Sequence, residues 1–511
     1  MIKIGANKLT LKDVEAILLD GEKVSVEGQA LARVTESFEF LKKFSQDKVI
    51  YGINTGFGPM AQYRINRKHQ EELQYNLIRS HCSGTGDAIP VLHVKALMIA
   101  RLNTLMLGKS GVHPDLVLLL AEYINRDICP VIYEHGSVGA SGDLVQLAHL
   151  ALGLIGEGEV HYKGKVQPID GVLKENGLIP FKVQGREGLA VMNGTAAMTG
   201  IGMVNLLKAK NLMNWTVAAS AILNEIVETY HDHFSEELNG AKVHFGQQEV
   251  ARMMRKVLEG SKLIKTRSEH LYEKTSDEPI FKEKVQEYYS LRCVPQIVGP
   301  VLDTIKYTEG IVLDEANSAN DNPIIDVATK NVYHGGNFHG DYVALEMDKL
   351  KIAITKMSML AERQLNYLMN HNINNKLRPF ANMGRLGLNF GMQGVQFTAT
   401  STTAENQTLS NPMSIHSISC NNDNQDIVSM GTNAAQITAR VIDNSFQVLA
   451  IELMTLIQAI DYLDFRDKMS LKSREVFDNL RVVVPPFKKD TTKYNEVRDM
   501  TNYLRQTRII I

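Results

Sequence analysis

Apolar side chains recur at alternating intervals of three and four residues over long segments in the second half of the chain. In the segment that begins at Val343, positions 347, 350, 354, 357, 361, 364 and 368 carry Met, Leu, Ile, Met, Ala, Gln and Leu. This spacing places the side chains on one face of a helix that packs on other helices. Residues 434–465 follow a similar pattern, and about 30 helical residues would span about 45 Å. We therefore predict an elongated central helical bundle.

The first third of the chain has shorter periods and more turns. Residues 51–59 hold three glycines and a proline, and residues 81–87 form a second turn-rich loop. Residues 158–167 predict a hairpin around Lys163-Gly164, in which Val160, Tyr162 and Val166 alternate. The charged stretch 266–283 is expected to be an exposed loop.

These patterns predict a mainly α fold, which the low number of prolines, 14, also favours. We expect an N-terminal mixed, loop-rich domain over residues 1–197, with a central helical bundle and a C-terminal helical region over residues 198–511. Four further loops with polar and turn-forming residues interrupt the helical periods, at 286–296, 317–326, 333–341 and 419–431.

Charge and cysteine content narrow the class of protein. The formal net charge is -2, which gives no global basic footprint for nucleic acid. The four cysteines are widely spaced, which favours reduced thiols in the cytoplasm over disulfides or a metal knuckle. We find neither a secretory signal nor an apolar run long enough for a membrane span. The sequence therefore predicts a soluble, cytoplasmic protein.

One glycine-rich loop, residues 136–143 (GSVGASGD), leads directly into an apolar helical segment that ends near Ile155. Asp143 occupies the position where a helix start favours a carboxylate. Taken alone, the loop is compatible with an ordinary connector. A phosphate cradle lacks the Gly-Lys-Ser/Thr ending, and a serine nucleophile elbow would need glycine where Asp143 stands.

Within this loop, Ala140-Ser141-Gly142 resembles the segment from which the aromatic amino acid and histidine ammonia-lyases build 4-methylidene-imidazol-5-one (MIO). In that family the Gly nitrogen attacks the Ala carbonyl and two waters leave, so that the Ser side chain becomes the methylidene. Gly is the least hindered amide nucleophile, and Ser supplies the hydroxyl that is eliminated. Similar motifs run in the family's order from YGINTGFG at residue 51 to NQDIVSMG at residue 424. The resemblance is greatest to the bacterial tyrosine ammonia-lyases.

The resemblance implies elimination of ammonia from an α-amino acid, with MIO as the electrophile that bonds the amine. A positioned base must remove the weakly acidic β-proton, and no metal is required. Tyr51 matches the general base, a role that needs a site favouring the phenolate, and helix N-termini could provide one. Tyr289 matches the second catalytic tyrosine, and Asn193 the group that polarises the MIO ring.

The same motifs imply how the substrate is held. Arg292 resembles the arginine that binds the substrate carboxylate, for which its planar fork is suited. Asn322 resembles a further carboxylate contact, and Phe338 a ring that packs near the prosthetic group. Read singly, each of these residues has a commoner structural role, because Asn-Gly and Asn-Pro are frequent turn formers and an arginine often forms an ion pair.

Two positions in the sequence bear on the choice of substrate, and they favour different substrates. Ser80-His81 resembles the pair that histidine ammonia-lyases carry at the substrate-ring end, but a His here also occurs in enzymes that act on tyrosine. Asn424-Gln425 resembles the phenylalanine and tyrosine enzymes, since histidine lyases carry a Glu where Gln425 stands. A neutral amide loses the charge-assisted hydrogen bond to imidazole, and His81 would be unpaired against a phenyl ring. We therefore expect L-tyrosine as substrate and trans-p-coumarate as product.

Three alternatives stay open. Histidine ammonia-lyase is the first, and a tyrosine 2,3-aminomutase, which shares MIO and returns ammonia to the β-carbon, is the second. The third is an inert helical oligomer. The resemblance further implies a homotetramer whose active sites draw on three chains. His231-Asp232-His233 has no evident third ligand, so a metal site is not expected there.

Overall fold

The computed structural model describes residues 1–272, 279–281 and 283–511. Residues 273–278 and 282, part of the charged loop expected at 266–283, lie outside the described residues. Helices account for 59% of the chain, so the predicted mainly α fold is confirmed.

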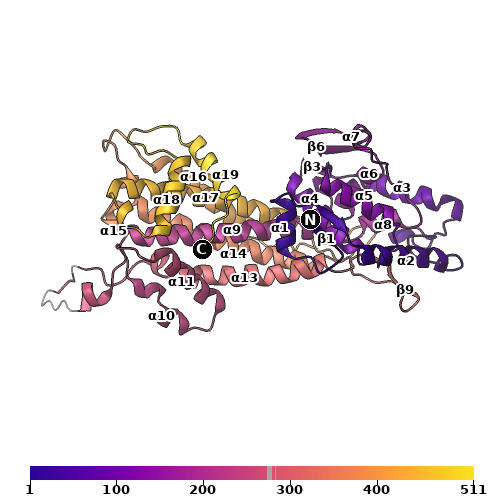
Figure 1. Cartoon of the computed structure of the whole chain (residues 1–511), viewed down its shortest axis with the longest axis horizontal. Coiled ribbons are helices and arrows are strands. Elements are labelled where there is room, and N and C mark those ends of the chain that lie inside the picture. The colour runs from indigo at the N-terminus through magenta and orange to yellow at the C-terminus, as the bar shows by residue number, and fades with distance from the viewer. Residues whose placement is uncertain (273–278, 282) are drawn as a thin grey trace. The chain divides into compact units, whose positions relative to one another are not determined.

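The chain folds into two compact units, each assembled from three segments. Unit 1 comprises Met1–Leu207, Thr308–Asp348 and Pro412–Ala439, and unit 2 comprises Lys208–Tyr307, Lys349–Asn411 and Arg440–Ile511. Four of the five divisions between them fall inside the four longest helices, α9 (Ala196–Ile226), α13 (Val294–Ala316), α14 (Asp341–Met369) and α17 (Gly431–Leu463), which Figure 1 labels, and the fifth lies between Asn411 and Pro412. The domain boundary expected at residue 197 stays a prediction.

Unit 1 contains shorter helices and all the described strands. Its helices are α1 (Leu11–Leu18), α2 (Gly28–Phe44), α3 (Gln70–His81), α4 (Val91–Leu105), α5 (Pro114–Asn125), α6 (Leu144–Leu154), α7 (Ile169–Asn176) and α8 (Glu187–Met192), with 3₁₀ turns η1 (Gly58–Met60) and η2 (Arg67–His69). Its strands are β1 (Ile2–Ile4), β2 (Val24–Val26), β3 (Thr85–Ala88), β4 (Cys129–Pro130), β5 (Tyr133–His135), β6 (Glu159–Tyr162), β7 (Lys165–Pro168), β8 (Ile324–Asp326) and β9 (Asn331–Tyr333). They form small sheets, β1-β2, β3-β5, β4-β6-β7 and β8-β9.

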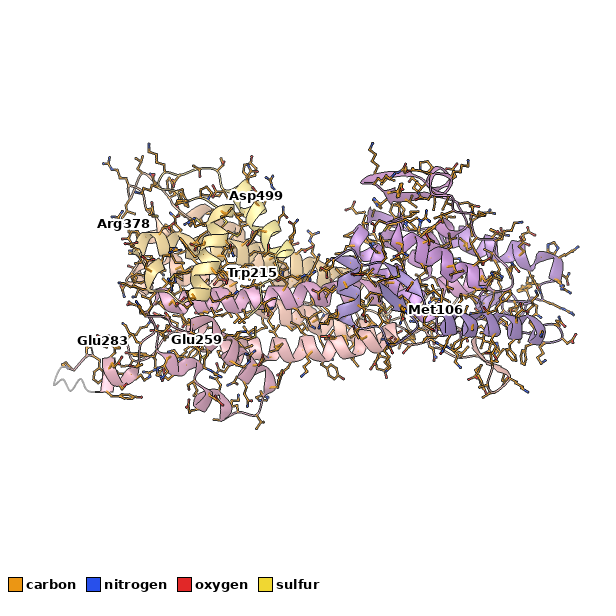
Figure 2. The ribbon with its side chains drawn as sticks, in the orientation of Figure 1. Met106, Trp215, Glu259, Glu283, Arg378 and Asp499 are labelled. Carbon is orange, nitrogen blue, oxygen red and sulfur yellow. The ribbon has the colours of Figure 1, made fainter. Side chains whose placement is uncertain are left out.

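Unit 2 is built from helices joined by loops, with no strand among its described residues. Besides its parts of the four long helices, it contains α10 (Glu236–Gly240), α11 (Phe245–Leu258), α12 (Tyr289–Arg292), α15 (His371–Asn374), α16 (Gln393–Leu409), α18 (Leu471–Val483) and α19 (Tyr494–Gln506), with short turns η3 (His231–Phe234), η4 (Ser268–Tyr272), η5 (Pro379–Ala381) and η6 (Arg466–Lys468). The single tryptophan, Trp215 on α9, is buried and donates its indole N–H to the Thr507 carbonyl (3.1 Å), which ties the chain terminus to the unit (Figure 2).

The apolar periodicity of residues 343–368 becomes helix α14. Its six apolar seam positions are at most 2% exposed, and the one polar member, Gln364, is buried with them. Buried amides need partners, and Gln364 donates to Ser220 Oγ (3.0 Å) and to the Ser290 carbonyl (2.7 Å). The periodicity of residues 434–465 becomes α17, and by length and composition that helix could also cross a membrane. However, 78% of its most apolar window is buried inside the protein.

The hairpin expected at 158–167 is present as β6 and β7, with Tyr162 paired to Lys165 across Lys163-Gly164. Both turn residues have positive φ, 50° and 74°, as a two-residue hairpin turn of this type requires. Of the three alternating residues, Val160 and Tyr162 are buried, whereas Val166 is 50% exposed. Val166 lies on the outer strand of its sheet.

The turn-rich loop expected at 81–87 is shorter than predicted. Helix α3 continues through His81, and Thr85–Ala88 is strand β3, which pairs antiparallel with β5. Local composition favours a turn here. The pairing to residues 133–135 is a tertiary contact, and local composition does not predict it. The pairing fixes the chain just beyond His81.

Candidate active site

The loop 136–143 lies where four helices of the chain begin. Backbone hydrogen bonds join the loop to these helix starts: Asp143 N–H to the Gly194 carbonyl (2.7 Å), Gly340 N–H to the Gly139 carbonyl (3.0 Å) and Met430 N–H to the Val138 carbonyl (3.0 Å). The residues after them begin α6, α9, α14 and α17. Because the first N–H groups of a helix lack intrahelical partners, each start carries partial positive charge. The loop therefore lies in a region of positive potential.

Gly142 needs to be glycine for two reasons. Its φ is +70°, and a Cβ built on it would lie 1.9 Å from the Gly194 carbonyl oxygen. The two glycines face each other as an isolated β-bridge. A side chain would collide with backbone that has no freedom to move, so the close approach of segments 141–143 and 193–195 depends on glycine.

Asp143 stabilises a different helix from the one the sequence suggested. It is the residue before α6, yet its carboxylate makes no cap hydrogen bond to that helix. Instead Oδ2 accepts from Met198 N–H in the first turn of α9 (2.8 Å), and Oδ1 accepts from Ser137 (2.8 Å) and Thr432 (2.5 Å). Burial raises the pKa of the Asp143 carboxyl, and these hydrogen bonds oppose the rise. The expected local cap is wrong because α9 begins within reach of the same carboxylate.

Two donors meet the carbonyl oxygen of Ser141. Asn193 donates Nδ2–H to it at 2.9 Å, and the backbone N–H of Gly194 donates at 3.3 Å. The Asn193 amide is held in this orientation because its Oδ1 accepts from the Asn322 N–H (2.7 Å). A carbonyl with two fixed donors is polarised in the way that an oxyanion hole polarises its substrate.

A fully buried arginine, Arg101 on α4, holds the backbone of Asn193 in place. Its guanidinium donates to the carbonyls of Asn193 (2.8 Å) and Ala190 and to Asn320 Oδ1 (3.2 Å). Burial lowers the pKa of Arg101 to about 10, so it keeps its charge at neutral pH. Our sequence analysis missed this residue. The available signal was a lone cation inside the apolar run ALMIARLNTLM.

A cavity of about 650 Å³ opens beside Ser141, and we call it the active-site cavity. Eight predicted site residues line it: Tyr51, His81, Ser141, Asn193, Asn322, Phe338, Asn424 and Gln425. Such a volume suits a small ligand. The Tyr51 hydroxyl accepts a hydrogen bond from Gly58 N–H (3.0 Å), and its ring lies edge-on to Phe57 with 6.1 Å between centroids.

Helix α3 supplies His81 at the end of a face that lines the active-site cavity. Its Nδ1 lies 3.0 Å from the Leu77 carbonyl and 3.1 Å from Ser80 Oγ. A carbonyl only accepts, so in the neutral ring Nδ1 carries the proton, which leaves Nε2 as an acceptor. The ring therefore offers an acceptor to a hydroxyl donor.

Several cavity-lining residues were not predicted. On α3 these are Leu73, Asn76 and Leu77, which share a helix face with Ser80 and His81; Phe57, Leu144 and Leu189 add apolar wall. Helical spacing back from His81 would have found the α3 residues. No local pattern marks Leu189, which reaches the cavity only through the packing of α8 on α3 and α6.

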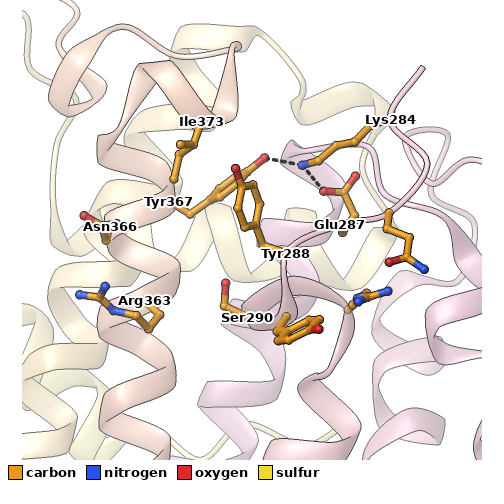
Figure 3. A pocket seen from close by; sticks show the side chains of 11 residues that line it. Lys284, Glu287, Tyr288, Ser290, Arg363, Asn366, Tyr367 and Ile373 are labelled. Carbon is orange, nitrogen blue, oxygen red and sulfur yellow. Dashed lines mark hydrogen bonds and ion pairs between the residues drawn. The ribbon is translucent and has the colours of Figure 1, made fainter. Parts of the chain in front are cut away.

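Tyr289 and Arg292 lie in unit 2 and line a different cavity, of about 760 Å³ (Figure 3). Tyr289 is 70% exposed, and the Arg292 guanidinium carbon lies 4.8 Å from the centre of its ring. Nearby, Lys284 forms an ion pair with Glu287 (2.5 Å) and donates to the Tyr367 hydroxyl (3.4 Å). These two residues therefore line a cavity of unit 2, whereas the other eight line the active-site cavity of unit 1.

In the part of the chain that the structure describes, no group of three or more His, Cys, Asp or Glu side chains is placed to hold a metal ion. Asp232, between the two histidines considered in the sequence, pairs with Arg267 (2.6 Å).

Comparison with known proteins identifies the family. A family model described as aromatic amino acid lyase matches residues 9–482. This chain belongs to the aromatic amino acid lyase family. The tyrosine 2,3-aminomutase of Chondromyces crocatus is 41% identical over 497 residues, which cover 96% of this chain and 93% of the relative. The histidine ammonia-lyase of Bacillus subtilis (strain 168) is 36% identical over 511 residues, with 100% and 97% covered.

The fold is that of solved family members. The structure of the tyrosine aminomutase from Streptomyces globisporus matches with a TM-score of 0.93 at 34% identity, covering 99% of this chain and 97% of that chain. The predicted family and fold are therefore confirmed, and the family is one of enzymes. The named relatives favour the aminomutase and histidine-lyase alternatives over the tyrosine ammonia-lyase that we expected from the sequence.

Proposed function

We propose that this chain eliminates ammonia from L-tyrosine to give trans-p-coumarate, using MIO formed from Ala140-Ser141-Gly142. When present, MIO supplies an electrophile that makes the amine a better leaving group. The residues found here fit that group. The Ser141 carbonyl, which would become the ring carbonyl, has two donors. Position 142 requires glycine, because a Cβ would collide with Gly194, and glycine is the least hindered amide nucleophile for ring closure.

The roles proposed for the chain's own residues follow from their positions in the active-site cavity. Tyr51 would remove the β-proton, and the helix starts around the loop 136–143 favour a negative charge nearby. Asn193, with the Gly194 N–H, would draw electron density toward the Ser141 carbonyl. Asn322 and Asn424 would orient the substrate, and Phe338 would exclude water.

The observation that carries the choice of tyrosine is the orientation of His81. With Nδ1–H donated to the Leu77 carbonyl, Nε2 is an acceptor that suits the phenol O–H of tyrosine. Phenylalanine would leave this acceptor unpaired, which typically costs 1–3 kcal/mol. Against histidine stands Gln425, a neutral amide where the histidine lyases are expected to carry a carboxylate.

Tyr289 and Arg292 enter this proposal through the homotetramer that the family resemblance implies. Arg292 would bind the substrate carboxylate with its planar fork, and Tyr289 would act as the second catalytic tyrosine. Both would reach the active-site cavity of another copy of the chain. The exposure of Tyr289, 70%, supports this role, because a residue that serves a neighbouring chain is accessible in one chain alone. A cytoplasmic location accords with the free cysteines.

The second candidate function is a tyrosine 2,3-aminomutase. It is favoured by the 41% identity to the Chondromyces crocatus enzyme of that name. Both reactions begin with the same elimination, and they differ in whether ammonia departs or returns to the β-carbon. The geometry of the active-site cavity supports the shared first half equally for both.

Product analysis with L-tyrosine, L-histidine and L-phenylalanine at equal concentration tests the proposal. We expect tyrosine to turn over fastest, with p-coumarate detected by its absorbance. β-Tyrosine as the main product would establish the aminomutase instead. Fastest turnover of histidine, with urocanate as product, would refute the assignment of tyrosine.

A further inference from the structure

The Ser141 hydroxyl has one defined partner in the structure. Gln425 donates Nε2–H to Ser141 Oγ at 2.9 Å, and this is the one hydrogen bond to that hydroxyl found among the described residues. Gln425 is distant in sequence and comes from the loop that precedes α17. The hydroxyl it holds is the group that must leave when the prosthetic group forms.

The Gln425 side chain is itself held in one orientation. Its backbone pairs in both directions with Cys420 (3.1 and 3.3 Å), which closes a short loop. The three residues at the tip of that loop, Asn421, Asn422 and Asp423, all have positive φ, between 51° and 58°, a conformation that Asn and Asp tolerate better than most residues. The Cys420 thiol lies 3.6 Å from Gln425 Oε1. With Oε1 facing the thiol, Nε2 faces Ser141.

The role of this hydrogen bond follows from the chemistry of maturation, by which we mean the formation of MIO from Ala140-Ser141-Gly142. Ring closure forms a bond from the Gly142 nitrogen to the Ala140 carbonyl carbon. The Ala140 oxygen leaves as water with the protons of the Gly142 and Ser141 amides. The second water consists of Ser141 Oγ, its own proton and the Cα proton. The Cα–H electron pair becomes the Cα=Cβ double bond, and the Cβ–Oγ pair leaves with the oxygen.

We propose that Gln425 promotes this second dehydration, by orienting the Ser141 hydroxyl and stabilising the charge that develops on its oxygen as it leaves. The inference rests on the proposed function, because it presupposes MIO. A neutral amide transfers no proton, so its contribution is that of a directed hydrogen-bond donor. Once the oxygen has left, Nε2 is free to face the active-site cavity. Gln425 therefore serves maturation first and the substrate afterwards.

Intact mass, followed during cell-free synthesis of the full chain, tests this directly. Wild-type protein should lose about 36 Da, two waters, as a consequence of the dehydration chemistry. In Gln425→Leu, which removes both polar atoms at similar size, the full loss should appear about ten- to hundredfold more slowly, since a hydrogen bond to a charged group has about that effect. A species about 18 Da below the encoded mass should accumulate, with the ring closed and the hydroxyl retained.

Three further variants separate maturation from catalysis and from folding. Tyr51→Phe should lose activity and still lose both waters at the wild-type rate, because Tyr51 makes no hydrogen bond to the loop 140–142 among the described residues. Gln425→Glu keeps the size of the side chain but replaces the donor by a carboxylate that only accepts hydrogen bonds, so it should mature no faster than Gln425→Leu. If Gln425→Leu does not fold, Cys420→Val, which removes only the thiol beside Oε1, should slow the same step.

Loss of both waters by Gln425→Leu at the wild-type rate would overturn the inference and leave the proposed function intact. A wild-type chain that retains its encoded mass would instead refute the proposed function itself. The two failures are therefore distinguishable.

Discussion

Asn193 uses both ends of its side-chain amide, and this fixes what it can do. Nδ2 donates to the Ser141 carbonyl, while Oδ1 accepts from Asn322 N–H. Reversing the amide would place like groups against each other at both ends, so the surrounding backbone selects one orientation. Arg101 holds the carbonyl of the same residue. A single Asn thus joins three segments of unit 1 at the loop 136–143.

We expect His81→Phe to shift substrate preference from tyrosine toward phenylalanine, by about ten- to hundredfold in the ratio of kcat/KM values. The change removes the Nε2 acceptor and leaves an apolar ring against the substrate. Steady-state kinetics with both amino acids measures the ratio. Ser80→Ala is the matched control, since it removes a neighbouring group and leaves the Leu77 contact that orients His81. An unchanged ratio in His81→Phe would remove this residue from the recognition of the phenol.

Eight residues of the active-site cavity could be predicted at the scale of residues, because they stand in contiguous and chemically specific motifs. Ala140-Ser141-Gly142, Tyr51 and Asn193 each stand within such a motif. Arg101 and Leu189 could not be found in this way. Their contribution depends on which backbone carbonyls or helices lie beside them, and that is decided by packing.

At the scale of elements, the arrangement of helix starts is the main determinant of the site. Four helices that are far apart in sequence begin at the loop 136–143. Amphipathic periodicity predicts α14 and α17 well, because a long apolar face is a property of the sequence alone. Periodicity does not predict which helix a carboxylate caps. Asp143 precedes α6 but caps α9, since the free N–H groups nearest in space belong to the other helix.

At the scale of elements, Glu452 in the middle of α17 is expected to make the stability of the protein depend on pH. It is fully buried, and neither carboxylate oxygen has a hydrogen-bond partner in the described part of the chain. Burial raises its pKa well above the ordinary 4.5. The folded state therefore holds this proton at pH values where the unfolded chain has released it, so stability falls as pH rises above about 4.5 toward the raised pKa.

Glu452→Gln should remove that fall, whose slope is at most about 1.4 kcal/mol per pH unit. The apparent melting temperature of both proteins between pH 5 and pH 9 measures it. The melting temperature of Glu452→Gln relative to that of wild type should rise with pH. Glu405→Gln, at an exposed site on α16, should show no such rise. A constant difference between Glu452→Gln and wild type across this range would contradict the prediction.

At the scale of the whole molecule, the predicted site residues divide between the two units. Eight lie around the active-site cavity in unit 1, and Tyr289 and Arg292 lie around another cavity in unit 2. In the sequence all of them appear as members of one set of motifs, because linear order carries no information about which copy of a chain supplies a residue. The proposed homotetramer accounts for the division, since a closed assembly can unite both cavities.

Complementation between two inactive variants tests this sharing. Ser141→Ala and Tyr289→Phe should each be inactive as the only chain present. When both are expressed together, mixed tetramers should regain activity, up to about a quarter of wild type if the chains assort at random. Separately purified proteins that are mixed without exchange of chains provide the control. Absence of activity in tetramers shown by mass to contain both variants would mean that the groups act within one chain.

The sequence by itself determined the family and the mainly helical fold, and it predicted the eight site residues that line the active-site cavity, because these depend on periodicity and on contiguous motifs. Tertiary structure alone decided that Asp143 caps α9, that Arg101 donates to the Asn193 carbonyl, and that Gln425 donates to the Ser141 hydroxyl. It also decided that Tyr289 and Arg292 line a cavity of unit 2 and not the active-site cavity of unit 1. Each of these is a matter of which groups meet in space, and separation along the chain does not encode it.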